Sequence, residues 1–148
     1  MFEKLNYIML SGVEYPIKCD MVVLERIQDD YGDFANFENR LDGFTPMKNK
    51  DGTYKKNEEG NMIGLRGEPY ISDLKKALTW MVNEGVEIAK EEGREVPNTE
   101  GVNLMRKVDM SPRELSEILR AEFARCFKRK NQETTQGEIP EMMKDPKK

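Results

Sequence analysis

The side chains in this sequence that could perform acid-base chemistry are carboxylates, and several of them form adjacent pairs. These pairs are Asp29 with Asp30, Glu58 with Glu59, and Glu91 with Glu92. Paired carboxylates share acid and base roles only when they converge on one substrate, and adjacent residues of a helix do not face each other. The sequence has no histidine, the usual general base and commonest metal ligand. We therefore interpret the pairs as solvated surface and expect no enzymatic activity, no catalytic residue and no cofactor.

Two other patterns could bind or exchange a ligand, namely one short turn and the cysteines. Residues 49–52, Asn-Lys-Asp-Gly, suggest a calcium loop, but the alternating oxygen ligands and the closing glutamate are out of register. A hairpin turn accounts for them better. Cys19 and Cys126 lie far apart in the chain, and each falls in an apolar pattern typical of small buried hydrophobes in a reducing compartment. The sequence thus predicts no metal site and does not indicate a disulfide.

The charge balance argues against nucleic acid and membrane as partners. The 148 residues include 24 basic and 28 acidic side chains, so there is no bulk attraction to phosphate. The basic clusters at 55–56 and 128–130 are short and have acidic neighbours. No apolar run approaches the roughly 20 residues of a membrane-spanning helix, and the start of the chain lacks the features of a signal peptide. We expect the protein to stay in the compartment where it is made.

The first element that could position a site is a β-hairpin. Residues 5–10 and 13–18 are extended runs that flank Ser11 and Gly12, a pair suited to a tight turn. Pro16 cannot donate a hydrogen bond to a strand ladder, so the second strand should present that position to an edge.

An amphipathic helix should follow, with Asp20 as its N-cap and Gly32 as its stop. Its expected apolar stripe contains Met21, Val23, Leu24, Ile27 and Tyr31. Asp33 can then cap a short second helix whose apolar residues are Phe34, Phe37 and Leu41.

The segment 42–67 departs from this helical pattern. It is charged and rich in turn signals, with a type I′ signal at Asp51-Gly52 and a second cluster at 57–60. We expect a solvated hairpin or a mobile loop that makes an excursion from the domain.

Residues 72–93 give the most regular helical signal and should form the central helix. The expected apolar face contains Leu74, Ala77, Leu78, Met81, Val82, Gly85, Ile88 and Ala89. A glycine within a helix is costly, so Gly85 suggests a close helix crossing. Trp80 falls outside this face, and two interpretations stay open. It either covers the excursion or makes a second internal contact, or it is an exposed anchor for a protein partner.

The last helix has a complete start signal. Ser111 is the expected N-cap, Pro112 the first helical residue and Glu114 the partner in a capping box. The stripe that follows contains Leu115, Ile118, Leu119, Phe123, Cys126 and Phe127. A weak short helix is expected within 97–109. Residues 131–148 have no periodic face and are expected to be a disordered tail.

Together these elements predict a mainly α fold of the α+β class. It consists of an N-terminal β-hairpin followed by a small bundle of about four helices, with the charged excursion at 42–67. The predicted single domain covers residues 1–130, and the predicted tail covers 131–148.

Four predicted elements follow one another in a set order. They are the hairpin with its GVEYPIK strand, the Asp-capped helix ending Asp-Tyr-Gly, the Trp-bearing central helix and the Ser-Pro-Arg-Glu-Leu helix. That series resembles the tail assembly chaperones of long-tailed bacteriophages, in the small helical versions carried by phages and prophages of Gram-positive bacteria. The likeness covers roughly residues 7–130, and the excursion at 42–67 departs from the family pattern.

The resemblance implies a non-enzymatic protein of the host bacterial cytoplasm that is absent from the mature virion. Its implied partner is the tape measure protein, which it keeps soluble for tail tube polymerisation. The tail tube protein is a further candidate partner, and self-association is expected. An apolar groove that accepts a client helix would suit this task. The candidate contact residues are Trp80, Tyr31, Phe34, Phe37, Met142 and Met143.

A second hypothesis is a small phage regulatory or DNA-associated protein with a helix-turn-helix at 102–130. It requires exposed basic residues along one face of the last helix, whereas the residues there mix both signs of charge. A salt-dependent gel shift would favour it, and co-purification with a tape measure fragment would favour the chaperone.

Overall fold

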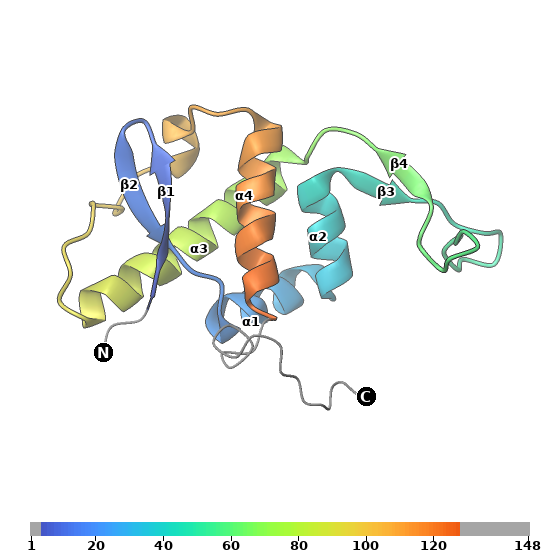
Figure 1. Cartoon of the computed structure of the whole chain (residues 1–148), viewed down its shortest axis with the longest axis horizontal. Coiled ribbons are helices and arrows are strands. Elements are labelled where there is room, and N and C mark those ends of the chain that lie inside the picture. The colour runs from blue at the N-terminus through green and yellow to red at the C-terminus, as the bar shows by residue number, and fades with distance from the viewer. Residues whose placement is uncertain (1–3, 128–148) are drawn as a thin grey trace.

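The computed structural model describes residues 4–127 and confirms the predicted α+β class (Figure 1). An N-terminal β-hairpin is followed, in this part of the chain, by four α-helices. The elements are β1 (Asn6–Leu10), β2 (Val13–Ile17), α1 (Met21–Tyr31), α2 (Phe34–Asp42), β3 (Phe44–Pro46), β4 (Gly64–Arg66), α3 (Ile71–Glu91), the 3-10 helix η1 (Leu104–Lys107) and α4 (Pro112–Arg125). The tail expected at 131–148 lies outside the described residues.

The hairpin turn is a two-residue turn, as predicted. Ser11 has φ of 50° and Gly12 has φ of 81°, and two successive positive φ values are the signature of type I′. Leu10 and Val13 face each other in the antiparallel register and close the turn. They therefore form a hydrogen-bonded pair of the ladder.

Along an antiparallel ladder, hydrogen-bonded pairs alternate with non-hydrogen-bonded pairs. Met9 opposite Glu14 and Tyr7 opposite Pro16 are consequently the non-hydrogen-bonded pairs. The missing donor of Pro16 thus falls where the ladder needs none, and the prediction of an edge-facing position is confirmed.

Gly85 allows α3 to approach the backbone of β2. A methyl group on Gly85 would lie 2.5 Å from both the carbonyl carbon and the carbonyl oxygen of Pro16. Nearby, the N–H of Lys18 donates to the carbonyl oxygen of Met81 at 3.0 Å. The predicted close crossing therefore exists, but its partner is a strand and not a second helix.

The start and stop of α1 are as predicted, and so is its apolar face except at Met21. The carboxylate of Asp20 accepts two main-chain N–H groups of the first turn, and Gly32 has φ of 85°. The buried residues are Val23 and Ile27. Met21, the first residue of α1, is 79% exposed, so its place in the predicted stripe is wrong.

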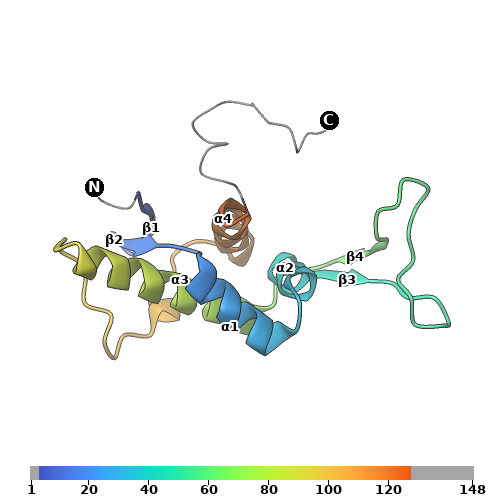
Figure 2. The ribbon, with the colours of Figure 1, turned by 90° about the horizontal axis from the view of Figure 1, so that it is seen from below.

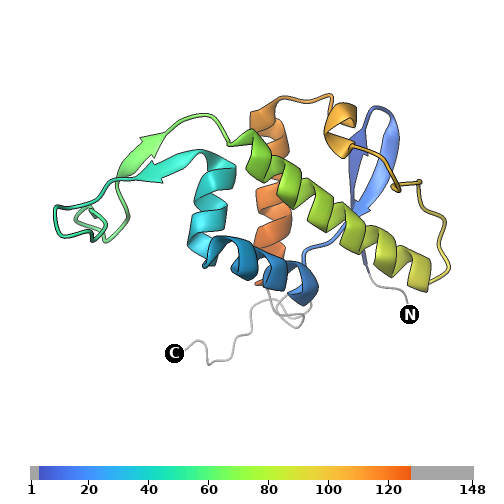
Figure 3. The same ribbon diagram turned by 180° about the vertical axis from the view of Figure 1, so that it is seen from behind.

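The central helix α3 organises the core. The β-hairpin and α4 lie on one side of it and α1 runs beside it (Figure 2), and the view from behind shows α3 crossing α4 (Figure 3). The buried apolar residues of α3 are Leu74, Ala77, Leu78, Met81, Val82, Val86 and Ala89. This is the predicted face except that Val86 is buried where Ile88 was expected.

The excursion at 42–67 is a branched hairpin that projects away from the helices (Figure 1). Its stem is β3 paired with β4, and two small loops closed by the bridges Lys48–Tyr54 and Lys56–Met62 extend from the end of the stem. Three main-chain bonds of 2.8–3.0 Å close the junction: residue 47 donates to 63, 55 to 47, and 63 to 55. The excursion is therefore a hairpin with ordered main-chain pairing.

The two small loops share one sequence pattern, Lys-Asn-x-x-Gly, at 48–52 and at 56–60. In each loop the glycine N–H donates to the asparagine carbonyl at 3.0 Å. Gly52 has φ of 90°, whereas Asp51 is not among the residues with positive φ. The predicted type I′ turn at Asp51-Gly52 is therefore wrong, because the enclosed loop is longer than two residues and uses a type I turn followed by a left-handed glycine.

The start of α4 is formed as predicted. The hydroxyl of Ser111 accepts the N–H of Glu114 at 3.1 Å, and the carboxylate of Glu114 accepts the N–H of Ser111 at 2.9 Å. Before α4, the short helix expected at 97–109 is the single 3-10 turn η1. Residues 102–127 thus contain one α-helix, so the pair of helices that a helix-turn-helix requires is not formed in this range.

The two cysteines, distant in the chain, come together at the end of α4. Both thiols are free, with Cys19 buried and Cys126 half-buried. A hydrogen bond with Cys126, followed by burial, raises the pKa of the Cys19 thiol well above its usual range. Cys19 therefore stays a neutral, inert core residue, as the sequence predicted.

Candidate protein-binding groove

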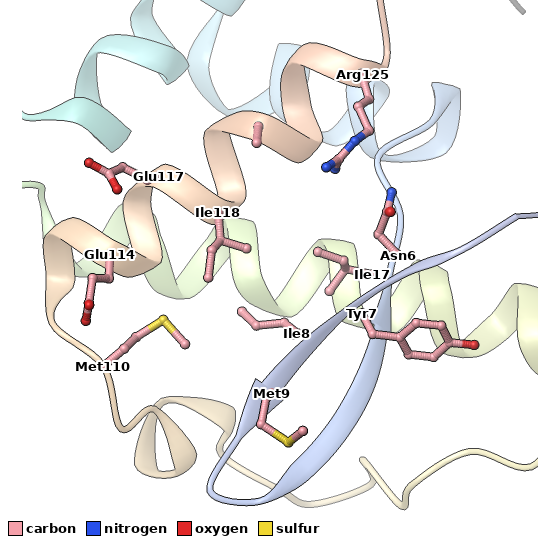
Figure 4. A pocket seen from close by; sticks show the side chains of 11 residues that line it. Asn6, Tyr7, Ile8, Met9, Ile17, Met110, Glu114, Glu117, Ile118 and Arg125 are labelled. Atoms are coloured by element: carbon pink, nitrogen blue, oxygen red, sulfur yellow. The ribbon is translucent and has the colours of Figure 1, made fainter. Parts of the chain in front are cut away.

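A groove of about 680 Å³ runs between strand β1 and helix α4 (Figure 4). We call it the β1–α4 groove. Its lining residues are Asn6, Tyr7, Ile8, Met9, Ile17, Met110, Glu114, Glu117, Ile118, Ala121 and Arg125. Most of this surface is aliphatic, sulfur-containing or aromatic, so the groove is suited to apolar side chains of a ligand.

The alternation of β1 produces one wall of the groove. Ile8 and Leu10 point into the core, while Tyr7 and Met9 point outward and are about half exposed. A strand on a protein surface normally places polar residues outward. The apolar outward face of β1 is therefore unusual. On the opposite face of the strand, Ile8 points toward Ile118 of α4 across the groove (Figure 4).

Buried Glu122 holds the two walls together. One carboxylate oxygen accepts from the amide of Asn6 at 3.1 Å and from the guanidinium of Arg125, and the other accepts from the N–H of Cys19 at 3.3 Å. Glu122 itself is 2% exposed. Such a carboxylate is tolerated only with its hydrogen-bond partners in place, so it fixes the hairpin against α4.

The charges at the rim of the groove are mainly negative. Glu114 and Glu117 project from α4 at one end of the groove (Figure 4). Arg125 lies at the other end, where its guanidinium already binds Glu122. The groove therefore offers apolar surface beside two carboxylates, an arrangement that favours an apolar ligand with positive charge.

The opposite side of α4 is fixed by an arginine cluster around Asp42. The carboxylate of Asp42 contacts Arg66 at 2.9 Å, Arg113 at 3.0 Å and Arg120 at 3.3 Å. Burial alone would raise the pKa of Asp42, but the hydrogen bond from Arg66 and the three guanidinium charges outweigh it and hold that pKa below its usual value. The basic residues of α4 thus serve structural ion pairs.

The aromatic residues predicted to contact a partner also contact one another. Tyr31 packs edge-on against Phe37 at 5.1 Å between ring centroids and against Trp80 at 6.4 Å, while Phe34 packs against Phe123 at 6.1 Å. We call these five residues the aromatic cluster. Phe37 also meets Phe123 at 5.1 Å, so the cluster joins α1, α2, α3 and α4.

Phe37 is 0% exposed, so its prediction as a partner contact is corrected to a core role. Trp80, Tyr31 and Phe34 are half-buried, and each packs against the core. For Trp80, the internal contact is the interpretation that the structure supports. The other two predicted residues, Met142 and Met143, lie outside the described residues.

A buried carboxylate fixes the polar end of the aromatic cluster. Asp73 accepts a hydrogen bond from the hydroxyl of Tyr31 and another from Arg40 at 2.7 Å. Burial, followed by the hydrogen bond to Asp73, raises the pKa of Tyr31 above its usual range. Tyr31 is thereby held as a neutral hydrogen-bond donor to Asp73.

One acidic group away from the groove has a pKa near neutrality. Burial raises the pKa of Glu84 to about 7, assisted by a hydrogen bond with Asp20 and by the charges of Asp20, Glu91 and Glu87. Asp20 is also the N-cap of α1, so this carboxyl pair joins α3 to the start of α1.

Two kinds of site are not formed by residues 4–127. Within that range, no group of three or more His, Cys, Asp or Glu side chains is placed to hold a metal ion. No helix in the same range combines the length and the apolar character needed to cross a membrane.

Comparison of the chain with protein-family models, with curated proteins and with solved structures finds no match.

One sequence signal indicates exposed apolar surface on the hairpin. Tyr7 and Met9 alternate with Ile8 and Leu10, so both faces of β1 are apolar. A two-stranded sheet at one end of a small domain can bury only one face against the core. The apolar residues of the other face are then available to a partner.

Proposed function

We propose that this chain is a non-enzymatic protein-binding module, a bacteriophage tail assembly chaperone that holds the tape measure protein in the β1–α4 groove. It acts in the host cytoplasm, before tail tube polymerisation, and leaves before the virion is complete. The observation that carries the proposal is the groove, an apolar surface bounded by a strand edge and a helix.

The physical task of such a chaperone is to cover apolar segments of a long client. Contiguous apolar surface that stays exposed on a folded chain is often a site for another protein. Here the apolar surface is concave and rimmed by polar groups, and Met9 and Met110 give it adaptable side chains. These features suit a client with many similar segments and no single binding sequence.

The charge distribution on α4 supports a protein client over DNA. Arg113 and Arg120 pair with Asp42, and Arg125 pairs with Glu122. The guanidinium groups of this helix are therefore already engaged by carboxylates, and its groove-facing side has Glu114 and Glu117. A phosphate backbone would meet repulsion at that rim.

Co-expression with the tape measure protein tests the proposal, using two variants matched in chemistry and location. Ala121 lines the groove, whereas Ala124 is exposed on the same helix outside it. Ala121→Arg fills the groove with a long charged side chain, and Ala124→Arg makes the same change at a nearby exposed position that does not line the groove. We expect soluble tape measure protein with the wild type and with Ala124→Arg, and aggregated tape measure protein with Ala121→Arg.

Thermal unfolding of both variants provides the control for folding. Each substitution is at an exposed helical position, so the free energy of unfolding should change by less than about 0.5 kcal/mol. Equal solubilisation by the two folded variants would overturn the groove as the client site. Absence of any soluble complex with the wild type would overturn the proposed function.

A further inference from the structure

The groove-facing edge of β1 has main-chain groups that lack a strand partner. In residues 4–127, β1 pairs with β2 alone, and Tyr7 and Met9 occupy the non-hydrogen-bonded positions of that pair. Their N–H and C=O groups therefore point away from β2. Neither residue makes a main-chain hydrogen bond outside the hairpin within the described range.

The groove follows this edge and not one face of the hairpin. Four consecutive residues of β1, Asn6 to Met9, line it, although successive residues of a strand point to opposite faces. A cavity that touches all four must run along the side of the strand. The close view shows β1 nearest the cavity with Ile118 across from it (Figure 4).

This geometry discriminates between a helix and a strand as the occupant. A helix satisfies its own main-chain groups, so a helix in the groove would cover the N–H and C=O groups of Tyr7 and Met9 without pairing them. Leaving buried polar groups unpaired is costly. An extended segment would pair with these groups and would extend the hairpin to three strands.

The rim specifies the charge of the occupant. Glu117 is exposed and forms no ion pair within 4 Å and no hydrogen bond among the described residues, although the Arg66 charge acts on it at longer range. Glu114 uses one carboxylate oxygen for the capping box. A lysine or arginine on the bound segment would find both carboxylates at one end of the groove, whereas an acidic segment would be repelled.

We propose that the β1–α4 groove binds an extended, cationic apolar segment of the client as a third strand along β1. The apolar side chains of that segment pack on Ile118 and Ala121, and its basic residue lies beside Glu114 and Glu117. This inference rests on the proposed function for the identity of the client. It departs from the expectation that the groove would accept a helix.

Proline substitutions on the two edges of the hairpin test the main-chain pairing. Met9→Pro removes an N–H that faces the groove and that the β1–β2 ladder does not use. Glu14→Pro removes the equivalent N–H of its register partner on the other edge. Pro16 already occupies such a position in β2, so the hairpin tolerates proline there. Met9→Ala shortens the side chain and keeps the N–H.

The affinity of the full chain for the tape measure protein is the quantity to compare. Loss of a main-chain hydrogen bond in a covered groove predicts roughly tenfold weaker binding for Met9→Pro than for Met9→Ala. Glu14→Pro should bind within twofold of the wild type. Glu117→Lys should weaken binding about threefold at low salt and less at high salt, as expected of a rim charge.

Hydrogen exchange in the wild-type complex gives an independent result if a proline variant does not fold. We expect the amides of Tyr7 and Met9 to become protected when the tape measure protein binds. Unprotected amides, or equal affinities for Met9→Pro and Met9→Ala, would overturn the proposal that the client binds as a third strand. The Ala121→Arg variant would still test whether the client binds in the groove. If no tape measure complex forms at all, the proposed function and this inference both fail.

Discussion

The aromatic cluster and the β1–α4 groove are both apolar, but only one of them is complete within the chain. In the cluster, every ring meets another ring and Phe37 is fully buried. In the groove, Tyr7 and Met9 line a cavity of about 680 Å³ and stay about half exposed. The cluster joins four helices, whereas the groove separates a strand from a helix.

This difference shows why residue type alone is a poor guide to a binding surface. Tryptophan, tyrosine and phenylalanine are enriched in interfaces, but they also dominate cores because of their large apolar area. Trp80 meets Tyr31 inside the fold. Met9, a less conspicuous residue, is 47% exposed beside the groove. What distinguishes the two regions is whether the apolar surface already has an internal partner.

The largest expected effect tests the structural role of the aromatic cluster. Phe37→Ala leaves a cavity among α1, α2 and α4 and should lower the free energy of unfolding by about 3–5 kcal/mol. Tyr54→Ala, an aromatic deletion on the projecting hairpin, should cost less than about 0.5 kcal/mol. Denaturant titration measures both. Folded Phe37→Ala should still bind the client, and a specific loss of binding with little loss of stability would place the client site at the cluster.

A smaller effect is expected where the hairpin rests on α3. Gly85→Ala improves helix propensity by about 1 kcal/mol, but its methyl group would lie 2.5 Å from the Pro16 carbonyl. The resulting shift of β2 should produce a net loss of about 1–3 kcal/mol. Because the hairpin is one wall of the groove, client affinity should fall as well.

The matched control for Gly85→Ala is Asn83→Ala, on an exposed position of the same helix. Its effect on stability should be within about 0.5 kcal/mol, with client affinity unchanged. A stability gain for Gly85→Ala would mean that α3 and β2 are not in close contact.

The smallest effect concerns pH and should involve neither region. The pKa of Glu84 is about 7 in the fold against an ordinary 4.5, so the folded chain binds an additional proton between these values. Stability from this group is therefore fully present below about pH 4.5 and is lost as the pH rises through 7. Glu84→Gln should flatten the change in melting temperature between about pH 5 and 8.

The amplitude of that pH effect should stay below about 1 kcal/mol because solvent screens a partly exposed carboxyl group. Glu95→Gln, at an exposed loop position, should retain the wild-type pH profile. Client binding should be equal in both variants at a given pH. An unchanged slope in Glu84→Gln would assign the pH dependence to other groups.

The local elements of this fold could be predicted because their signals are local. The Ser11-Gly12 turn, the Asp20 cap, the Gly32 stop and the Ser111 capping box each depend on a few neighbouring residues. These features place the hairpin and the helices along the chain. They contain no information about which apolar face meets which.

The parts that the sequence did not predict depend on contacts between distant residues. Gly85 approaches Pro16 across 69 positions of sequence, and Glu122 binds Asn6 across 116. Periodicity marked Met21 as core, but no element covers the first residue of α1. The groove is a consequence of such long-range packing, so it could be found only after the hairpin and α4 were placed together.

Photo-crosslinking to the tape measure protein tests the central claim most directly. A benzophenone amino acid would replace Met9 in the groove, Phe34 in the aromatic cluster, or Leu65 on the projecting hairpin, where the side chain is 73% exposed. Our account predicts efficient crosslinks to the client from position 9 and few from positions 34 and 65. Crosslinks concentrated at position 34 or 65, with none at position 9, would contradict it.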